Sequence, residues 1–131
     1  MAAPNIVNVA TITGITTIRA GISTAGASNG ITTIVTNAAS SNKVLKINSL
    51  VATAIGDTTG VTVQLFDGAG AHTAAAHTVS VATTMTVPLY SSLAVIDKTN
   101  SIYLQEGHQI GCTAQSNAGS IDIVCSYEDI S

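Results

Sequence analysis

The sequence contains very little charge. Only 8% of its 131 residues are charged, against about 25% in a typical globular domain. Four of these residues are Lys or Arg, which is too few for the usual phosphate contacts of a nucleic-acid-binding protein. The formal net charge is only −3 and 46% of the residues are apolar, which is unlike an intrinsically disordered chain. We therefore expect a folded protein that does not bind nucleic acid.

Long hydrophobic runs are also missing. Histidine, threonine and serine interrupt the most alanine-rich stretch, from Ala71 to Ala82, and no run approaches the roughly 20 residues of a membrane-spanning helix. The opening residues, Met1 to Asn5, lack the basic and apolar regions of a secretory signal peptide. We expect no membrane association and no export by that route.

Aromatic residues and charged helix formers are scarce, and β-branched residues take their place. The chain has no Trp, one Phe and three Tyr. Val, Ile and Thr are stiff at χ1 and favour strands. We expect one core of small aliphatic side chains beneath a neutral surface of Ser, Thr, Asn and Gly. Such a surface is poorly protected against association, so we expect the protein to pack against a partner.

Short apolar–polar alternations separated by turn residues predict about eight to ten strands. Gly14 is expected to separate a strand near 5–13 from one near 15–20, and 79–82 and 85–89 are expected as separate strands. Pro88 is expected at a sheet edge or a strand end. The number and spacing of the strands predict an all-β protein, an antiparallel β-sandwich of jelly-roll type, with a small closed barrel as the alternative.

Residues 1–42 differ from the rest of the chain because Arg19 is their only charged side chain. They are interpreted either as the first strands of the sandwich or as an extended assembly arm that orders against a partner. The polar loop 38–42 is a possible boundary, after which residues 43–131 form the sandwich core. We expect one domain in total.

The two cysteines are expected to be buried free thiols. If residues 116–119 close a hairpin, Cys112 lies opposite Ile123 and Cys125 lies opposite Ile110. The cysteines are then diagonal neighbours about 7–8 Å apart, beyond the usual distance for a disulfide. A bulge would change this register, so a disulfide stays open as an alternative.

Residues with catalytic chemistry are scattered. His72 and His77 lie five positions apart, on opposite faces of a strand, which does not suit a metal pair. Glu106 and His108 flank a glycine and are interpreted as a turn before a strand. No phosphate-binding loop or nucleophile motif is present. We expect a non-enzyme with no cofactor and no metal, although a hydrolase of unknown type is retained as a minor alternative.

Several segments share a strand-and-turn pattern with a known family. These are Met1–Val9, Ala38–Ser49, Val95–Lys98, Ser101-Ile-Tyr-Leu-Gln-Glu-Gly107, Ile110–Ala114, and Asp122–Ser131 with its Ser-Tyr-Glu run. In this pattern the chain resembles the small virion structural proteins of tailed phages that infect cyanobacteria. The resemblance covers most of the chain, and its motifs are structural and not catalytic.

The resemblance implies a β-sandwich head decoration (cement) protein that binds the major capsid protein or another virion protein and bridges capsomers. It implies a homo-oligomer, with a trimer favoured, assembled in the host cytoplasm and placed on the capsid surface. The alternative is a tail, neck or fibre-associated protein of the virion that contacts host surface glycans.

Candidate contact residues come from the apolar, weakly charged N-terminal part and from the last strand. They are Ile12, Ile15, Ile18 and Tyr127. A core or edge role remains open for each of them. Sugar-binding sandwiches usually expose aromatic rings, and the few aromatic side chains here are assigned mostly to the core. A carbohydrate-binding domain is therefore the less favoured interpretation.

Overall fold

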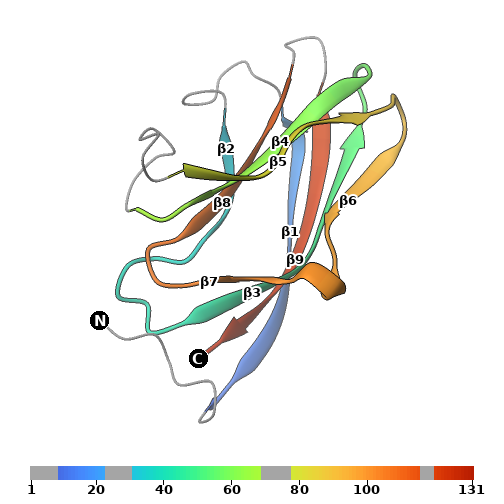
Figure 1. Ribbon diagram of the computed structural model, residues 1–131. Helices are drawn as coiled ribbons and strands as arrows, with labels where there is room; N and C mark the ends of the chain where they lie inside the picture. The colour runs from blue at the N-terminus through green and yellow to red at the C-terminus, as the bar shows by residue number, and fades with distance from the viewer. Residues whose placement is uncertain (1–8, 23–30, 69–77, 116–119) are drawn as a thin grey trace.

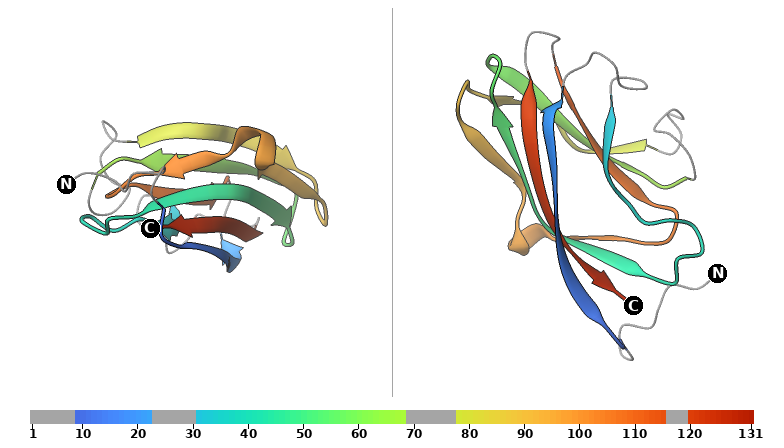
Figure 2. Two further views of the ribbon diagram at one scale, coloured as in Figure 1. Left: turned by 90° about the horizontal axis from the view of Figure 1, so that it is seen from below. Right: turned by 180° about the vertical axis from the view of Figure 1, so that it is seen from behind.

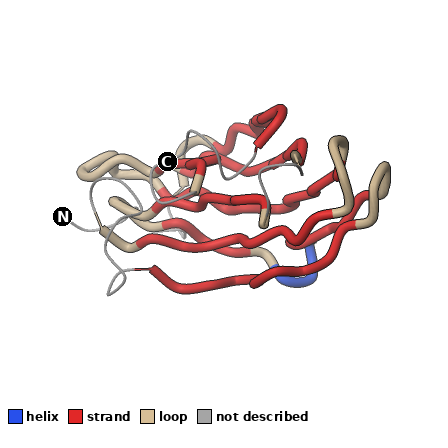
Figure 3. The backbone as a smooth tube through the Cα atoms, turned by 90° about the horizontal axis from the view of Figure 1, so that it is seen from above, coloured by secondary structure: helices blue, strands red, loops and turns tan. Residues whose placement is uncertain are grey.

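A computed structural model describes residues 9–22, 31–68, 78–115 and 120–131. The regular secondary structure of this part is β-strand, apart from one short 3-10 turn (Figures 1 and 3). The elements are β1 (Ile12–Ile22), β2 (Thr32–Thr36), β3 (Val44–Ala54), β4 (Thr59–Phe66), β5 (Thr78–Val87), β6 (Ser92–Ile96), η4 (Lys98–Asn100), β7 (Ile102–Leu104), β8 (Gln109–Ala114) and β9 (Ile121–Ile130). No helix in the described ranges is long and apolar enough to cross a membrane.

The strands form two antiparallel sheets packed face to face (Figure 2). One sheet has the order β1-β9-β3-β6, with β7 pairing beside β6 along β3, and the other has the order β2-β8-β4-β5. With β7 set aside, this is the strand order of an eight-stranded jelly roll. The predicted all-β sandwich is therefore confirmed, as two open sheets and not a closed barrel.

The core lies between the sheets and is built from small aliphatic side chains, as the composition predicts. In β9 the alternate residues Ile121, Ile123 and Cys125 are buried and point toward the other sheet. In β3, Leu45 and Ile47 point inward, and a bulge near Asn48 shifts the inward set to Leu50, Ala52 and Ala54. Alternation along each strand thus places one face in the core and one face outward.

Two predicted strand breaks are wrong. β1 runs through Gly14 without interruption, because strand pairing with β9 holds the residues on both sides in one register. β5 likewise spans 78–87, and a local register shift near Thr84, at φ +52°, replaces the expected break. Pro88 directly follows β5, an edge strand, so its predicted placement is confirmed.

The predicted hairpin between the two cysteine-bearing strands is also wrong. β8 pairs with β2 and β4, whereas β9 pairs with β1 and β3 in the other sheet. Cys112 and Cys125 therefore lie on facing sheets, not on neighbouring strands. Alternation and turn residues are the same for a hairpin and for a connection that crosses between sheets, so the sequence could not distinguish them. Residues 116–119 lie outside the described part.

The described part of residues 1–42 contributes one strand to each sheet. β1 is the edge strand next to β9, and β2 is the edge strand next to β8. In the left view of Figure 2, β1 lies at the outer edge of its sheet. The two strands also contact each other across the sandwich.

Candidate functional site

A row of aliphatic side chains crosses the outer face of the sheet that contains β1. Ile18 of β1 is paired with Val124 of β9, and Val124 is paired with Val51 of β3. Ala94 of β6 extends the row beyond Val51. Because Ile123 and Cys125 point into the core, Val124 must point outward. We call Ile18, Val124, Val51 and Ala94 the outer row.

The outer row is open to solvent at its β1 end. The side chain of Ile18 is 74% exposed and that of Val124 is 43% exposed. A contiguous exposed apolar surface on a soluble protein is typical of an interaction site, whereas single exposed apolar residues are ordinary. The register that joins these residues in one line therefore makes the outer row a candidate docking surface.

The four residues proposed from sequence fall on both faces of the sheet. Ile12 is 61% exposed and lies on the outer face with Ile18. Ile15 and Tyr127 are half-buried partners across the β1–β9 pair, and Tyr127 packs against the core cluster. Sequence reasoning missed Val124, whose signal was its position between two buried residues of β9.

Polar rows lie on either side of the outer row. Thr16 and Ser126 share a hydroxyl–hydroxyl hydrogen bond of 3.1 Å in the next row. On the other side, the backbone N–H of Gly21 donates to a carboxylate oxygen of Asp122 at 2.9 Å. These polar groups form hydrogen bonds with their neighbours within the sheet. The outer row is thus an apolar line between two rows whose polar groups already have partners.

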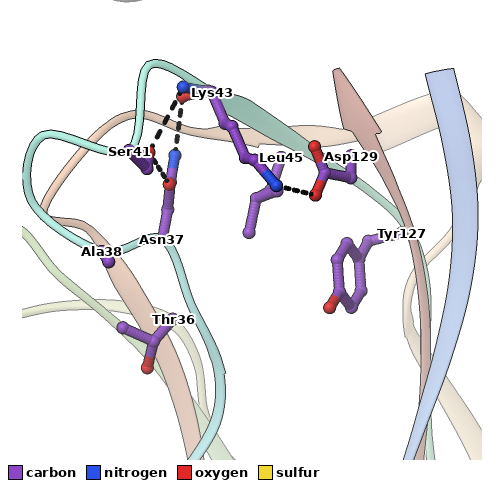
Figure 4. Close-up of a pocket in the computed structure, with 8 residues that line it drawn as sticks. All are labelled: Thr36, Asn37, Ala38, Ser41, Lys43, Leu45, Tyr127 and Asp129. Atoms are coloured by element: carbon purple, nitrogen blue, oxygen red, sulfur yellow. Dashed lines mark hydrogen bonds and ion pairs between the residues drawn. The ribbon is translucent and has the colours of Figure 1, made fainter. Parts of the chain in front are cut away.

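The second feature is a cavity of about 320 Å³ at one end of the sandwich (Figure 4). Its size is at the lower limit for small-molecule sites. Lys43 donates to Asp129 at 2.8 Å across it, and the hydroxyl end of Tyr127 points into it. The lining comes from the end of β2, the β2–β3 connection, the start of β3, and β9: Thr36, Asn37, Ala38, Ser41, Lys43, Leu45, Tyr127 and Asp129.

Asn37 organises the wall of this cavity. Its side-chain NH₂ donates to the carbonyl oxygens of Lys43 (2.9 Å) and Leu104 (3.0 Å), and its Oδ1 accepts from Ser41 at 2.5 Å. Its backbone bonds the segment that begins at Gly107. The side chain is buried, and both of its N–H donors and its oxygen acceptor are hydrogen-bonded. The polar groups of the wall therefore hold two loops together.

The predicted Glu106–Gly107 turn is confirmed, with Gly107 at φ +82°. Glu106 accepts a hydrogen bond from the backbone N–H of Asn42 at 2.6 Å, so its carboxylate fixes the neighbouring loop. Within the described ranges, no group of His, Cys, Asp and Glu side chains could hold a metal ion. His72 and His77 lie outside those ranges.

Both cysteines are buried in the core as free thiols, as predicted. Burial raises the pKa of Cys125 to about 11. Burial, with a smaller contribution from Cys125, raises the pKa of Cys112 further. Raised pKa values keep both groups protonated, whereas reactive cysteines have lowered pKa values.

The assignment of aromatic side chains to the core is wrong for two of the four. Tyr90 is 79% exposed and Tyr103 is 50% exposed. Tyr103 pairs with Lys46, whereas the N–H of Tyr90 bonds Ala54, eight positions farther along β3. That separation corresponds to about 27 Å, so the two rings cannot stack on one sugar. Tyr90 lies in the connection between β5 and β6, and Tyr103 lies in the short strand β7, so neither ring is held in the core.

Comparisons with known proteins give little information. No protein-family model and no curated protein matches the chain. One similar solved structure is a protein of the Bacillus endospore appendages, which are described as a family of disulfide-linked pili. It is 13% identical, with a TM-score of 0.47, over all of this chain and 96% of that one. A likeness this distant carries no conclusion about the function of this chain.

Proposed function

We propose that this protein is a structural component of a tailed-phage virion, a decoration protein that docks on the outside of the head through its outer row. The observation that carries the proposal is the line of registered aliphatic side chains across β1, β9 and β3, with Ile18 and Val124 exposed. Its partner is the major capsid protein or another virion protein.

Several further features support this role. Jelly rolls occur in viral capsid proteins, although they also occur in lectins and cupins, so the fold alone does not decide the function. Lectins and cupins act through exposed aromatic platforms or metal sites. The two exposed tyrosines lie far apart, and the described ranges hold no metal-binding group. An exposed row of aliphatic side chains suits protein–protein contact instead.

Decoration of a head needs many equivalent contacts, each of which can be weak. Symmetric arrays gain affinity from multivalency. When one contact of a subunit breaks, the remaining contacts hold the subunit in place until the broken contact forms again. The homo-oligomeric state belongs to this proposal, and a trimer is the arrangement that the family resemblance favours.

The experiment is a binding assay on undecorated phage heads with the variant Val124→Lys. A lysine at the centre of the outer row places a charge against an apolar contact, so we expect binding to fall at least about tenfold. The matched control is Val79→Lys, because Val79 is 66% exposed on β5 of the other sheet. Equal binding of both variants would contradict docking through the outer row.

A further inference from the structure

The backbone of β1 offers hydrogen-bonding groups along a free edge. Thr11 and Ser131 exchange two backbone hydrogen bonds, N–H to O in each direction, at 3.0 Å. In an antiparallel pair such residues alternate with residues whose groups point the other way. The register from Thr11 to Arg19 is unbroken, so the N–H and C=O groups of Ile12, Gly14, Thr16 and Ile18 point away from β9. No described strand pairs with them.

This edge lacks the protection that edge strands usually carry. Native proteins block free edges with charged residues, prolines or bulges. Between Ile12 and Ile18 there is no charged residue and no proline, and the register is regular. Arg19 and the irregularity before Ile22 come only afterwards. The segment is thus a regular, neutral edge of seven residues.

The sequence of the segment is nearly the same in both directions. Ile12-Thr-Gly-Ile15-Thr-Thr-Ile18 has Ile at its centre, Ile at both ends, and Thr or Gly between them. A strand of this pattern is complementary to an antiparallel copy of itself, because each residue type meets its like. A twofold interface requires this kind of self-complementarity.

We propose that β1 pairs antiparallel with β1 of a second copy of this chain, about a twofold axis at Ile15. Ile12 then lies opposite Ile18 of the second copy, and Gly14 lies opposite Thr16. All four of these residues direct their backbone groups to the free edge, so they form the hydrogen-bonded pairs of the new ladder. A shift by two residues in either direction would place an isoleucine opposite threonine, glycine or alanine.

Side-chain rows of the two sheets become continuous in this register. Within one copy, Ile12 is paired with Ile130, and Ile130 with Val44. Pairing of Ile12 with Ile18 of the second copy joins these aliphatic residues to the outer row of that copy. The polar rows meet as well, since Gly14 is next to Glu128 and Thr16 is next to Ser126. Pairing thus gives the exposed Ile12 and Ile18 an apolar neighbour each.

The first test measures the mass of the isolated protein in solution, so its outcome does not depend on a virion role. Wild type is expected to have twice the mass of one chain. Ile18→Lys is expected to raise the dissociation constant of the pair at least about tenfold, while Val79→Lys leaves it unchanged. A wild-type protein that stays monomeric at millimolar concentration would overturn the proposal, as would an Ile18→Lys variant that dimerises normally.

The second test fixes the register by disulfide trapping. Residue 15 lies on the proposed axis, where directly opposed residues of a non-hydrogen-bonded pair have Cα atoms about 4.5 Å apart, within disulfide range. Oxidised Ile15→Cys should therefore form a covalent dimer. Ile12→Cys should not, because its own copy would lie six residues away, about 20 Å.

Wild type is the control for trapping, because its two native thiols are buried. A covalent dimer of Ile12→Cys, or failure of Ile15→Cys in a protein that dimerises, would overturn the proposed pairing. A dimer mass that disappears when other proteins are removed would instead identify a different occupant of the edge, and would also overturn it.

Discussion

Asn37 shows how much one buried polar side chain can organise. Its amide bonds the carbonyl oxygens of Lys43 and Leu104, which belong to segments far apart in the sequence. Its oxygen accepts from Ser41. Buried carbonyl groups without a partner are costly, so this one residue holds the β2–β3 connection against the end of β7.

Replacement of Asn37 should be strongly destabilising. Asn37→Ala leaves two carbonyl oxygens without their donor. Each buried oxygen left without a hydrogen bond costs about 1–3 kcal/mol of stability. We expect a loss of about 2–4 kcal/mol in the free energy of unfolding, measured by urea titration. Asn48→Ala, in the bulge of β3 and outside this network, is the matched control and should cost less than about 1 kcal/mol. A similar loss in both variants would contradict the role given to Asn37.

The buried thiols predict a loss of stability at alkaline pH. The pKa of Cys125 is raised to about 11 from its ordinary value of 9.0, so the folded state binds this proton more tightly than the unfolded state. The stabilisation is complete below pH 9 and is lost as pH rises toward about 11.

The measurement is the urea midpoint as a function of pH in wild type and in Cys125→Ala. The variant should show a smaller fall between about pH 8 and pH 11, because other alkaline titrations are common to both proteins. At about pH 8 the thiols of the folded protein should resist a thiol reagent and react after unfolding. Rapid reaction in the folded state would contradict their burial.

Among the elements, β1 is bonded to β9 along one side and has no described partner strand along the other. Its odd-numbered residues bond β9, and its even-numbered residues direct their backbone groups to the free side. Neighbouring residues of the same type therefore direct their backbone N–H and C=O groups to opposite sides of the strand. Thr16 and Thr17 are such a pair, and proline at either position removes one N–H group.

Thr17→Pro and Thr16→Pro should consequently differ in the stability of the single chain. Thr17→Pro breaks a hydrogen bond to β9 and should lower the free energy of unfolding by about 1–3 kcal/mol. Thr16→Pro removes a donor on the free side, where proline is tolerated, and should cost clearly less. Urea titration at low protein concentration compares the two. The reverse order would show that the hydrogen-bonding phase of β1 is assigned wrongly.

The elements also show what the sequence could and could not predict. Alternation of apolar and polar residues located most strands and the core face of β9, because a strand buried on one side carries its own pattern. The pattern did not predict which strands pair with one another. The connection between Ala114 and Ile121 was interpreted as a hairpin, although β8 and β9 lie in different sheets. Val124 was missed for the same reason, since its role depends on the register with Ile18 and Val51.

For the whole molecule, the low charge is most evident at two surfaces. The free edge of β1 has no charged side chain from Ile12 to Ile18, and the outer row consists of aliphatic side chains. Both surfaces meet at Ile18, so paired copies would present one enlarged face toward a capsid. The β1 pair is proposed for the isolated protein and the trimer for the assembled head, where the twofold contact can connect neighbouring trimers.

Association through neutral surfaces should depend little on salt. Screening weakens contacts between exposed charges, and the proposed pairing segment has none. We expect the dissociation constant of the β1 pair to change less than about threefold between low and physiological ionic strength, measured by sedimentation equilibrium. A steep rise with salt would indicate that Arg19 or Glu128 makes the contact instead.

The central claim, that this chain is a repeated structural subunit on a phage head, is tested most directly by a cryo-EM map of purified particles combined with a count of copies per particle. We expect density for the jelly roll on the outer surface of the head, at hundreds of copies, with the outer row facing the capsid. A few copies at the neck or tail would favour the tail-associated alternative, and absence from the particle would contradict a virion role altogether.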